Sequence, residues 1–260
     1  MAELVTRREN AIGWILFSNP ARQNALTYEM IVALPEALAQ HERDPKVRVI
    51  AFAGDDERTV VSGADVTEFA AARGSVAVAA TYIRAMEEAH RAMASARKPT
   101  LACIRGPWFG GGLSLALYCD MRICADDAEL SQPGVRLGSA LSYPSTKCLV
   151  DLVGPGRAAD LLLTGRSVAA AEALALGLVN RMVPAAELSA AFAVLSEEIG
   201  GNAPLSIAAA KIGIRAARLE PGQIEMREVL AAIDAAHASE DAVEGRKAFA
   251  EKRKPRFRGR

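Results

Sequence analysis

The chain has few aromatic residues, no long apolar run and no net charge. Phe, Trp and Tyr make up 5% of its 260 residues, and alanine supplies much of an apolar content of 51%. No apolar run reaches the roughly 18 residues that a membrane-spanning helix needs. Basic and acidic residues both number 31, so no global field attracts nucleic acid or membrane. The composition predicts a soluble globular protein with a sizeable core.

Cysteine and histidine are also scarce, and neither is clustered. The cysteines form no CxxC pair, and nothing at the start resembles a signal peptide, so we expect a reduced, cytoplasmic protein. No histidine lies four residues from another, which argues against a metal site. The histidines are His41, His90 and His237.

The order of apolar patterns predicts an α/β fold whose last third is helical. Strands are predicted at Val5–Arg8, Ala11–Phe17, Val47–Ala53, Pro99–Arg105 and Met121–Ala125. Helices are predicted from a Thr27 cap to about Arg43, from Asp65, over Val76–Ala96, from the Gly110 cluster to about Tyr118, and at Leu205–Leu219, Ile224–Ala238 and Asp241–Lys252.

Two glycine-containing turns, each between a strand and a helix, are the first candidate site. One is Ser62-Gly63-Ala64-Asp65, and the other is Gly110-Gly111-Gly112. Small residues let a ligand approach the backbone, and the first N–H groups of a helix lack intrahelical partners. Two such N–H groups converging on one oxygen would stabilise an enolate or a tetrahedral oxyanion. The alternative is a pair of tight turns without function.

Several motifs, in order and spacing, resemble the crotonase (enoyl-CoA hydratase/isomerase) superfamily over about residues 5–257. They are Asn24-Ala25-Leu26, the two glycine turns, Cys119-Asp120, Leu161–Gly165, Gly177-Leu178-Val179 and Phe249–Pro255. The resemblance implies a ClpP/crotonase-like α/β fold of repeated β-β-α units over residues 1–200. It also implies a helical trimerisation region at 201–260, and hence a homotrimer or a dimer of trimers. The substrate is expected to be an acyl-CoA thioester, with coenzyme A entering as part of the substrate and no separate cofactor.

By position, the resemblance assigns the oxyanion-holding N–H groups to Ala64 and Gly111. It assigns contacts with the substrate or its CoA moiety to Arg22, Ala25, Ser62, Asp65, Gly110, Ser114, Gly134, Phe249 and Lys252. The last two lie in a basic tail, with eight basic residues and one acid from Arg246 to Arg260. In the family this tail reaches the CoA of a neighbouring subunit. A simply solvated C-terminus is the alternative.

The chain departs from the hydratases at both of their catalytic carboxylates. The first position is Ser114 and the second is Gly134, and neither can accept a proton as a carboxylate does. Candidate replacements are Tyr143, as a proton donor or a residue that packs at a helix start, and Ser142, as an N-cap or a nucleophile. No histidine lies near Ser142 in the sequence. Lyase, isomerase, decarboxylase and hydrolase activities stay open, as does a non-catalytic acyl-CoA carrier, whereas RNA binding finds little support.

Overall fold

The computed structural model describes residues 2–56, 60–65 and 76–260. The strands are β1 (Glu3–Glu9), β2 (Ile12–Ser18), β3 (Val49–Gly54), β4 (Thr100–Ile104), β5 (Pro107–Phe109), β6 (Met121–Ala125), β7 (Glu129–Ser131), β8 (Ser167–Ala169) and β9 (Arg181–Val183). The α-helices are α1 (Tyr28–Arg43), α3 (Val76–Ser95), α4 (Gly111–Ala116), α5 (Tyr143–Val153), α6 (Pro155–Thr164), α7 (Ala170–Leu176), α8 (Leu188–Gly200), α9 (Pro204–Ala216), α10 (Met226–His237) and α11 (Glu240–Ala250).

The strands form two sheets. The larger has the order β1-β2-β3-β4-β6-β9 and is parallel except for the β1–β2 hairpin. The smaller has the order β5-β7-β8. From β4 to β7 the strands alternate between the two sheets, so that β4, β5 and α4 make one β-β-α unit, and β6 and β7 start another. This alternation is the repeated β-β-α arrangement that the family resemblance implies.

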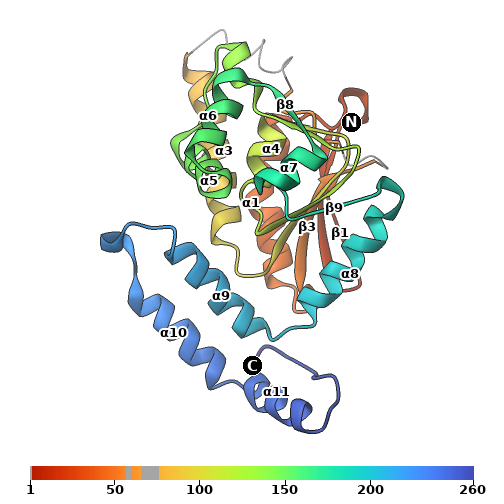
Figure 1. Ribbon diagram of the computed structural model, residues 1–260, viewed down its shortest axis with the longest axis vertical. Coiled ribbons are helices and arrows are strands. Elements are labelled where there is room, and N and C mark those ends of the chain that lie inside the picture. The colour runs from red at the N-terminus through yellow and green to blue at the C-terminus, as the bar shows by residue number, and fades with distance from the viewer. Residues whose placement is uncertain (1, 57–59, 66–75) are drawn as a thin grey trace.

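Helices cover both faces of the larger sheet (Figure 1). On one face, α1 and α3 contribute Met30, Leu34 and Met93 to the main core. On the other, α8 packs Phe192 and Leu195 against strand residues in a second apolar cluster. The two clusters explain why the central strands are apolar on both faces, as parallel strands between helical layers must be.

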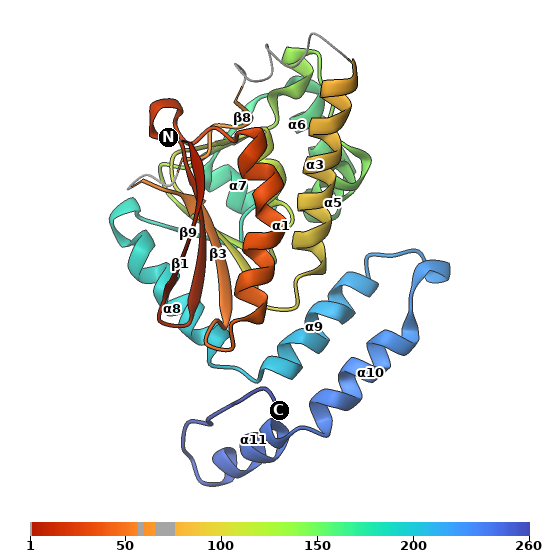
Figure 2. The same cartoon turned by 180° about the vertical axis from the view of Figure 1, so that it is seen from behind.

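The last three helices project away from the layered core. Figures 1 and 2 show α9 and α10 side by side, with α11 and the C-terminus at the end of the molecule remote from α6. No residue of α9 is buried. Among the described helices, none has both the length and the apolar character needed to cross a membrane.

Most predicted elements are present, with bounds that differ by a few residues. Thr27 caps α1 by accepting a hydrogen bond from the Met30 N–H at 3.3 Å, as predicted. The helix predicted to extend to about Tyr118 ends earlier, at Ala116. The short helix predicted to begin at Asp65 lies in residues 66–75, outside the described residues. The three-residue strands β5, β7, β8 and β9 were not predicted, because so few residues carry no periodic signal.

Candidate active site

The two glycine turns lie next to each other because short backbone bridges join them. The Val61 N–H donates to the Pro107 carbonyl at 3.1 Å, and the Phe109 N–H donates back to the Val61 carbonyl at 3.1 Å. On the opposite side, the Leu26 N–H donates to the Gly63 carbonyl at 2.7 Å. The turn at residues 62–64 is thus held between β5 and the segment that precedes α1.

This arrangement brings two backbone nitrogen atoms close together. A Cβ added to Gly111 would lie 3.6 Å from the Ala64 nitrogen, and one added to Gly63 would lie 4.0 Å from the Gly111 nitrogen. In the part of the chain that the structure describes, neither the Ala64 nor the Gly111 N–H donates a hydrogen bond. Both residues are partly exposed. The pair can therefore donate to one oxygen of a bound molecule.

The backbone of these turns requires glycine at two positions. Gly63 has a φ of +110°, and a Cβ there would lie 3.1 Å from the Phe109 carbonyl oxygen. Gly110 has a φ of +50° and its carbonyl accepts from the Gln132 side chain at 2.8 Å. Side chains at either position would strain the backbone that aims the two N–H groups.

Four predicted CoA-binding residues lie close together beside the first turn. The Ser62 hydroxyl donates to the Arg22 carbonyl at 3.0 Å, and the Ala25 N–H donates to the same carbonyl at 3.0 Å. The Arg22 guanidinium lies 3.5 Å from the buried Asp65 carboxylate. The Arg22 side chain is still about half exposed, so it can contact a ligand at the rim of this cluster.

The two positions that carry carboxylates in the hydratases have different surroundings. Ser114 is buried in α4, three residues after Gly111. Gly134 lies in a short 3-10 helix, Pro133–Leu137, where its carbonyl accepts from the Ser139 N–H at 2.9 Å. A Cβ at Gly134 would lie 3.0 Å from the Ser139 carbonyl oxygen, so a glutamate there would require this turn to shift.

A buried cluster of hydroxyls and one imidazole surrounds Ser114. The Ser114 Oγ lies 3.1 Å from the His90 Nε2 and 3.4 Å from the Ser145 Oγ. The Ser145 Oγ is also 3.1 Å from the Ser142 Oγ and 3.2 Å from the Tyr118 hydroxyl. The rings of His90 and Tyr118 stack with centroids 4.3 Å apart. We refer to these five residues as the Ser114 cluster.

The electrostatics of this cluster follow from burial. Desolvation lowers the pKa of His90 to about 4, so its imidazole is neutral near pH 7. Burial is likewise the largest influence on Tyr118, and it raises the pKa of that hydroxyl. The five side chains of the cluster are therefore neutral near pH 7, although the Arg218 guanidinium lies close enough to act on the Tyr118 hydroxyl.

The sequence predicted only part of this cluster. Ser142 was a candidate because it stands before α5, and it does join the cluster, although its side chain makes no N-cap hydrogen bond. The absence of a nearby histidine in the sequence was a misleading signal, because His90 reaches Ser114 from α3, 24 residues earlier. The spacing of four residues between Met86 and His90 places them on one face of α3, but it does not reveal that this face meets α4.

Tyr143 is not part of the Ser114 cluster. Its side chain is 79% exposed at the start of α5, so it does not pack into the core of its own chain. The packing alternative is therefore wrong for the single chain. Among the described residues, the Tyr143 hydroxyl makes no hydrogen bond.

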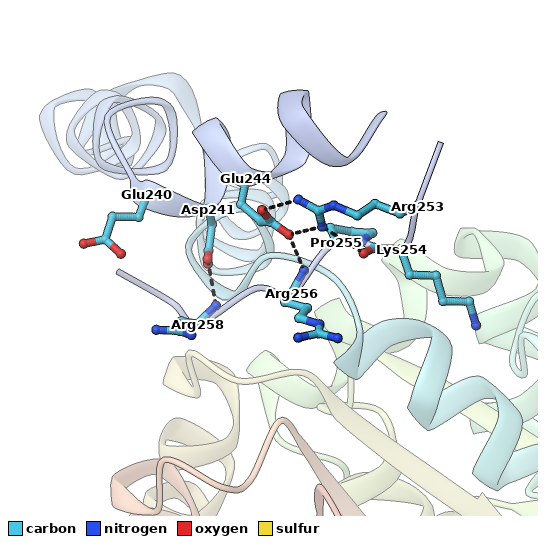
Figure 3. A pocket seen from close by; sticks show the side chains of 8 residues that line it. All are labelled: Glu240, Asp241, Glu244, Arg253, Lys254, Pro255, Arg256 and Arg258. Carbon is cyan, nitrogen blue, oxygen red and sulfur yellow. Dashed lines mark hydrogen bonds and ion pairs between the residues drawn. The ribbon is translucent and has the colours of Figure 1, made fainter. Parts of the chain in front are cut away.

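The basic tail folds back onto α11 and pairs many of its groups there (Figure 3). Glu244 accepts from the Arg253 guanidinium at 2.6 and 2.9 Å, and Asp241 accepts from the N–H groups of Arg258 and Gly259, both at 2.7 Å. These contacts fix the path of the tail within its own chain. The tail is therefore neither a loose solvated end nor wholly available for phosphates.

The two tail residues predicted to reach CoA are nevertheless free of those pairs. The Phe249 side chain is 88% exposed. Lys252 is exposed and has a φ of +54°, where the chain turns out of α11. Phe249 lies on α11 and Lys252 just after it, and α11 lies away from α4 in Figure 1. Within one chain they do not join the glycine turns, so any shared role requires a second copy.

Comparison with known proteins identifies the family. The enoyl-CoA hydratase/isomerase family matches residues 7–260. The chain belongs to the enoyl-CoA hydratase/isomerase family. It is 30% identical to a crotonyl-CoA hydratase of Syntrophomonas wolfei, over 98% of this chain and 97% of that protein. It is 36% identical to a carnitinyl-CoA dehydratase of Proteus mirabilis, over 95% and 94% of the two chains.

Solved structures of this family have the same fold. A family member from Hyphomonas neptunium superposes with a TM-score of 0.93 at 31% identity, covering 99% of this chain and 98% of that one. The predicted crotonase-like α/β fold is thereby confirmed. Because the match includes α9–α11, the C-terminal helices belong to the shared architecture and are not an addition peculiar to this chain.

Proposed function

We propose that this protein is an enzyme that acts on an acyl-CoA thioester and holds the thioester oxygen with the N–H groups of Ala64 and Gly111. The observation that carries the proposal is that these two nitrogen atoms lie close together on partly exposed residues, and that neither N–H donates a hydrogen bond among the residues the structure describes. Preorganised donors of this kind stabilise negative charge that develops on an oxygen during reaction. Membership of the enoyl-CoA hydratase/isomerase family supports the CoA thioester as the substrate class.

The CoA moiety is proposed to bind along the cluster of Arg22, Ala25, Ser62 and Asp65. Arg22 offers an exposed cation at its rim, which suits a phosphate. A neighbouring copy would add Phe249, which lies on α11, and Lys252, which lies in the turn after α11. Gly110 contributes by its backbone shape, and no cofactor beyond the CoA of the substrate is required.

The Lys252 contribution can be tested directly. Lys252→Ala should weaken the binding of a CoA thioester by about 1 kcal/mol, the usual scale of one charge-assisted contact. Isothermal titration calorimetry measures this loss, and Lys46→Ala is a matched control because Lys46 is exposed on the loop between α1 and β3. Equal affinity in the Lys252 and Lys46 variants would remove the phosphate role.

The reaction is proposed not to be efficient hydration of an enoyl thioester. Hydration needs one group to activate water and another to protonate the α-carbon. Ser114 and Gly134 replace both carboxylates, and the turn at Gly134 has little room for a longer side chain. Tyr143 is kept as a candidate proton donor from an exposed position, and Ser142 as a candidate hydroxyl of the Ser114 cluster.

The second candidate function is an acyl-CoA carrier that binds without turnover, which the two missing carboxylates favour. A panel of saturated, unsaturated and α-carboxylated acyl-CoA thioesters separates the possibilities. Mass spectrometry of the products should show conversion of at least one thioester, and calorimetry should show that it binds. Binding of the whole panel without any conversion would establish the carrier instead, and failure to bind any member would refute both.

A further inference from the structure

The Ser114 cluster lies one helical turn from the proposed oxyanion site on both α3 and α4. On α4, Ser114 follows Gly111 by three residues, a rise of about 4.5 Å. On α3, His90 follows Met86 by four residues, and the Met86 methyl approaches the Cβ position of Gly111 at 3.7 Å. The two helices thus present Met86 beside Gly111 and, one turn further on, His90 beside Ser114.

The Ser114–His90 contact has the geometry of a hydroxyl paired with a base. The distance of 3.1 Å between Oγ and Nε2 is within hydrogen-bond reach, and both side chains are about 95% buried. Stacking on Tyr118 fixes the plane of the imidazole. The Ser145 Oγ is a second hydrogen-bond partner of the Ser114 Oγ, at 3.4 Å. The Ser114 oxygen therefore keeps a partner when its proton passes to His90.

Resting on the function proposed above, we propose that Ser114 and His90 together replace the first hydratase carboxylate, and that the protein hydrolyses its acyl-CoA thioester. Ser114 is the catalytic residue that contacts the attacking water. His90 is a positioning residue that acts through Ser114 by accepting its proton. Ser114 follows Gly111 by about one turn of α4, and the attacking water is assigned to the space between the Ser114 hydroxyl and the thioester carbonyl.

The step balances with water as the only co-reactant. The water oxygen bonds to the thioester carbonyl carbon while a water proton passes to the Ser114 Oγ and the Ser114 proton passes to His90 Nε2. The carbonyl electrons move to oxygen, where the Ala64 and Gly111 N–H groups stabilise the charge. When the C–S bond breaks, the proton held by His90 returns through the Ser114 hydroxyl to the CoA sulfur, leaving a carboxylic acid and free CoA.

The basicity of His90 fits this substitution. Burial lowers its pKa to about 4, close to the value of about 4.3 for an ordinary glutamate side chain. The site therefore retains, through Ser114, a proton acceptor about as basic as the carboxylate that hydratases place at this position. Tyr118 stacks on the imidazole, and its raised pKa keeps it neutral over the same range, while Cys148 and Arg218 act on the Tyr118 hydroxyl from α5 and the segment after α9.

A single base and two oxyanion donors suit hydrolysis better than hydration. A thiol has a pKa of about 8.5, so the CoA thiolate departs without a strong acid. Hydration of an enoyl group additionally requires a proton donor for the α-carbon, which the Gly134 position no longer supplies. The remaining groups thus match the demands of thioester cleavage.

The test compares thiol release with binding in matched variants. Acetyl-CoA, butyryl-CoA and benzoyl-CoA are the probes, with a chromogenic thiol reagent to measure free CoA and calorimetry to measure affinity. Ser114→Ala and His90→Gln should each lower kcat at least about 100-fold, the lower range for a proton-transfer group. Their affinities should stay within about twofold of the unaltered protein. Ser196→Ala, which removes another buried serine on α8, should leave kcat unchanged.

The pH profile gives a readout that a structural role would not change. In the unaltered protein, kcat should fall on the acid side with a midpoint below about pH 5, because protonated His90 cannot accept a proton. Thiol release in Ser114→Ala within about twofold of the unaltered protein, or an acid midpoint at pH 6 or above, would overturn the assignment. Acyl-CoA binding without thiol release would also overturn it while leaving the proposed substrate class intact, whereas absent binding would refute both.

Discussion

At the scale of one residue, the burial of His90 makes the stability of the protein depend on pH. Its pKa falls from 6.5 to about 4 on folding, and desolvation is the cause. Between these values the unfolded chain binds a proton that the folded chain does not, so stability declines as pH falls from 6.5 toward 4. The shift corresponds to roughly 3 kcal/mol at its limit.

We therefore expect His90→Gln to remove this part of the pH dependence. At pH 7 the variant loses stability through the disrupted Ser114 cluster, and at pH 4.5 its deficit relative to the unaltered protein should shrink by about 2 kcal/mol. Urea denaturation at both pH values measures the two deficits. A deficit that is equal at pH 7 and pH 4.5 would mean that His90 is not held neutral by burial.

Individual residues also show how much of the candidate site could be predicted from the sequence. Ala64 and Gly111 could be assigned from the resemblance because the site depends on backbone N–H groups whose positions follow the motif spacing. The Ser114–His90 contact could not be predicted, since it depends on how α3 packs against α4 across 24 residues of sequence. The exposure of Tyr143 could not be predicted either, because a residue at a helix start has no periodic pattern that fixes its surroundings.

At the scale of elements, the contact between α4 and residue 61 holds the two turns in place. A Cβ on Gly112 would lie 2.6 Å from the Val61 carbonyl oxygen, which is a backbone atom and cannot rotate away. That carbonyl also accepts from the Phe109 N–H, so moving it disturbs the bridge beside Ala64. Gly112 is required here because the helix and the bridge approach so closely.

Gly112→Ala should therefore destabilise the protein by about 1 to 3 kcal/mol and lower kcat/KM for any converted thioester. Gly156→Ala is the matched control, because Gly156 lies in α6 with no heavy atom within 4 Å of its Cβ position. The control should be neutral or slightly stabilising. Unchanged stability and activity in Gly112→Ala would show that this contact does not support the site.

The sequence predicted long elements well, and it did not predict short strands that form only by pairing with distant segments. Long helices and the strands of the larger sheet had clear patterns, because their apolar residues recur over several turns or fill a buried run. The strands of the smaller sheet span three residues each, and only pairing with distant segments makes them strands. The repeated β-β-α arrangement thus came from the family resemblance and not from local patterns.

At the scale of the whole molecule, the C-terminal helices have apolar surface that one chain leaves uncovered. Ile214 is 65% exposed, Leu230 is 54% exposed and Phe249 is 88% exposed. Exposed apolar patches on a projecting helical arm favour association with other copies. We expect a trimer or a hexamer, in which α11 of one subunit can approach the CoA site of another.

Multi-angle light scattering at micromolar concentration should give three or six times the chain mass of 27.5 kDa. Leu230→Glu should shift the distribution toward smaller species, because it places a charge on the uncovered face of α10. Arg227→Glu on the same helix is a control for the added negative charge. A monomeric mass for the unaltered protein would contradict the proposed assembly.

The central claim is that this family member keeps the oxyanion site but lacks the groups for efficient hydration. The most direct measurement is the formation of hydroxybutyryl-CoA from crotonyl-CoA, followed by mass spectrometry, with calorimetric binding of crotonyl-CoA on the same preparation. Because a catalytic proton-transfer group contributes about 10²–10⁴-fold, losing two should leave at most a trace of hydrated product despite clear binding. Hydration at about 10² s⁻¹ or faster, a rate typical of efficient enzymes, would contradict the account.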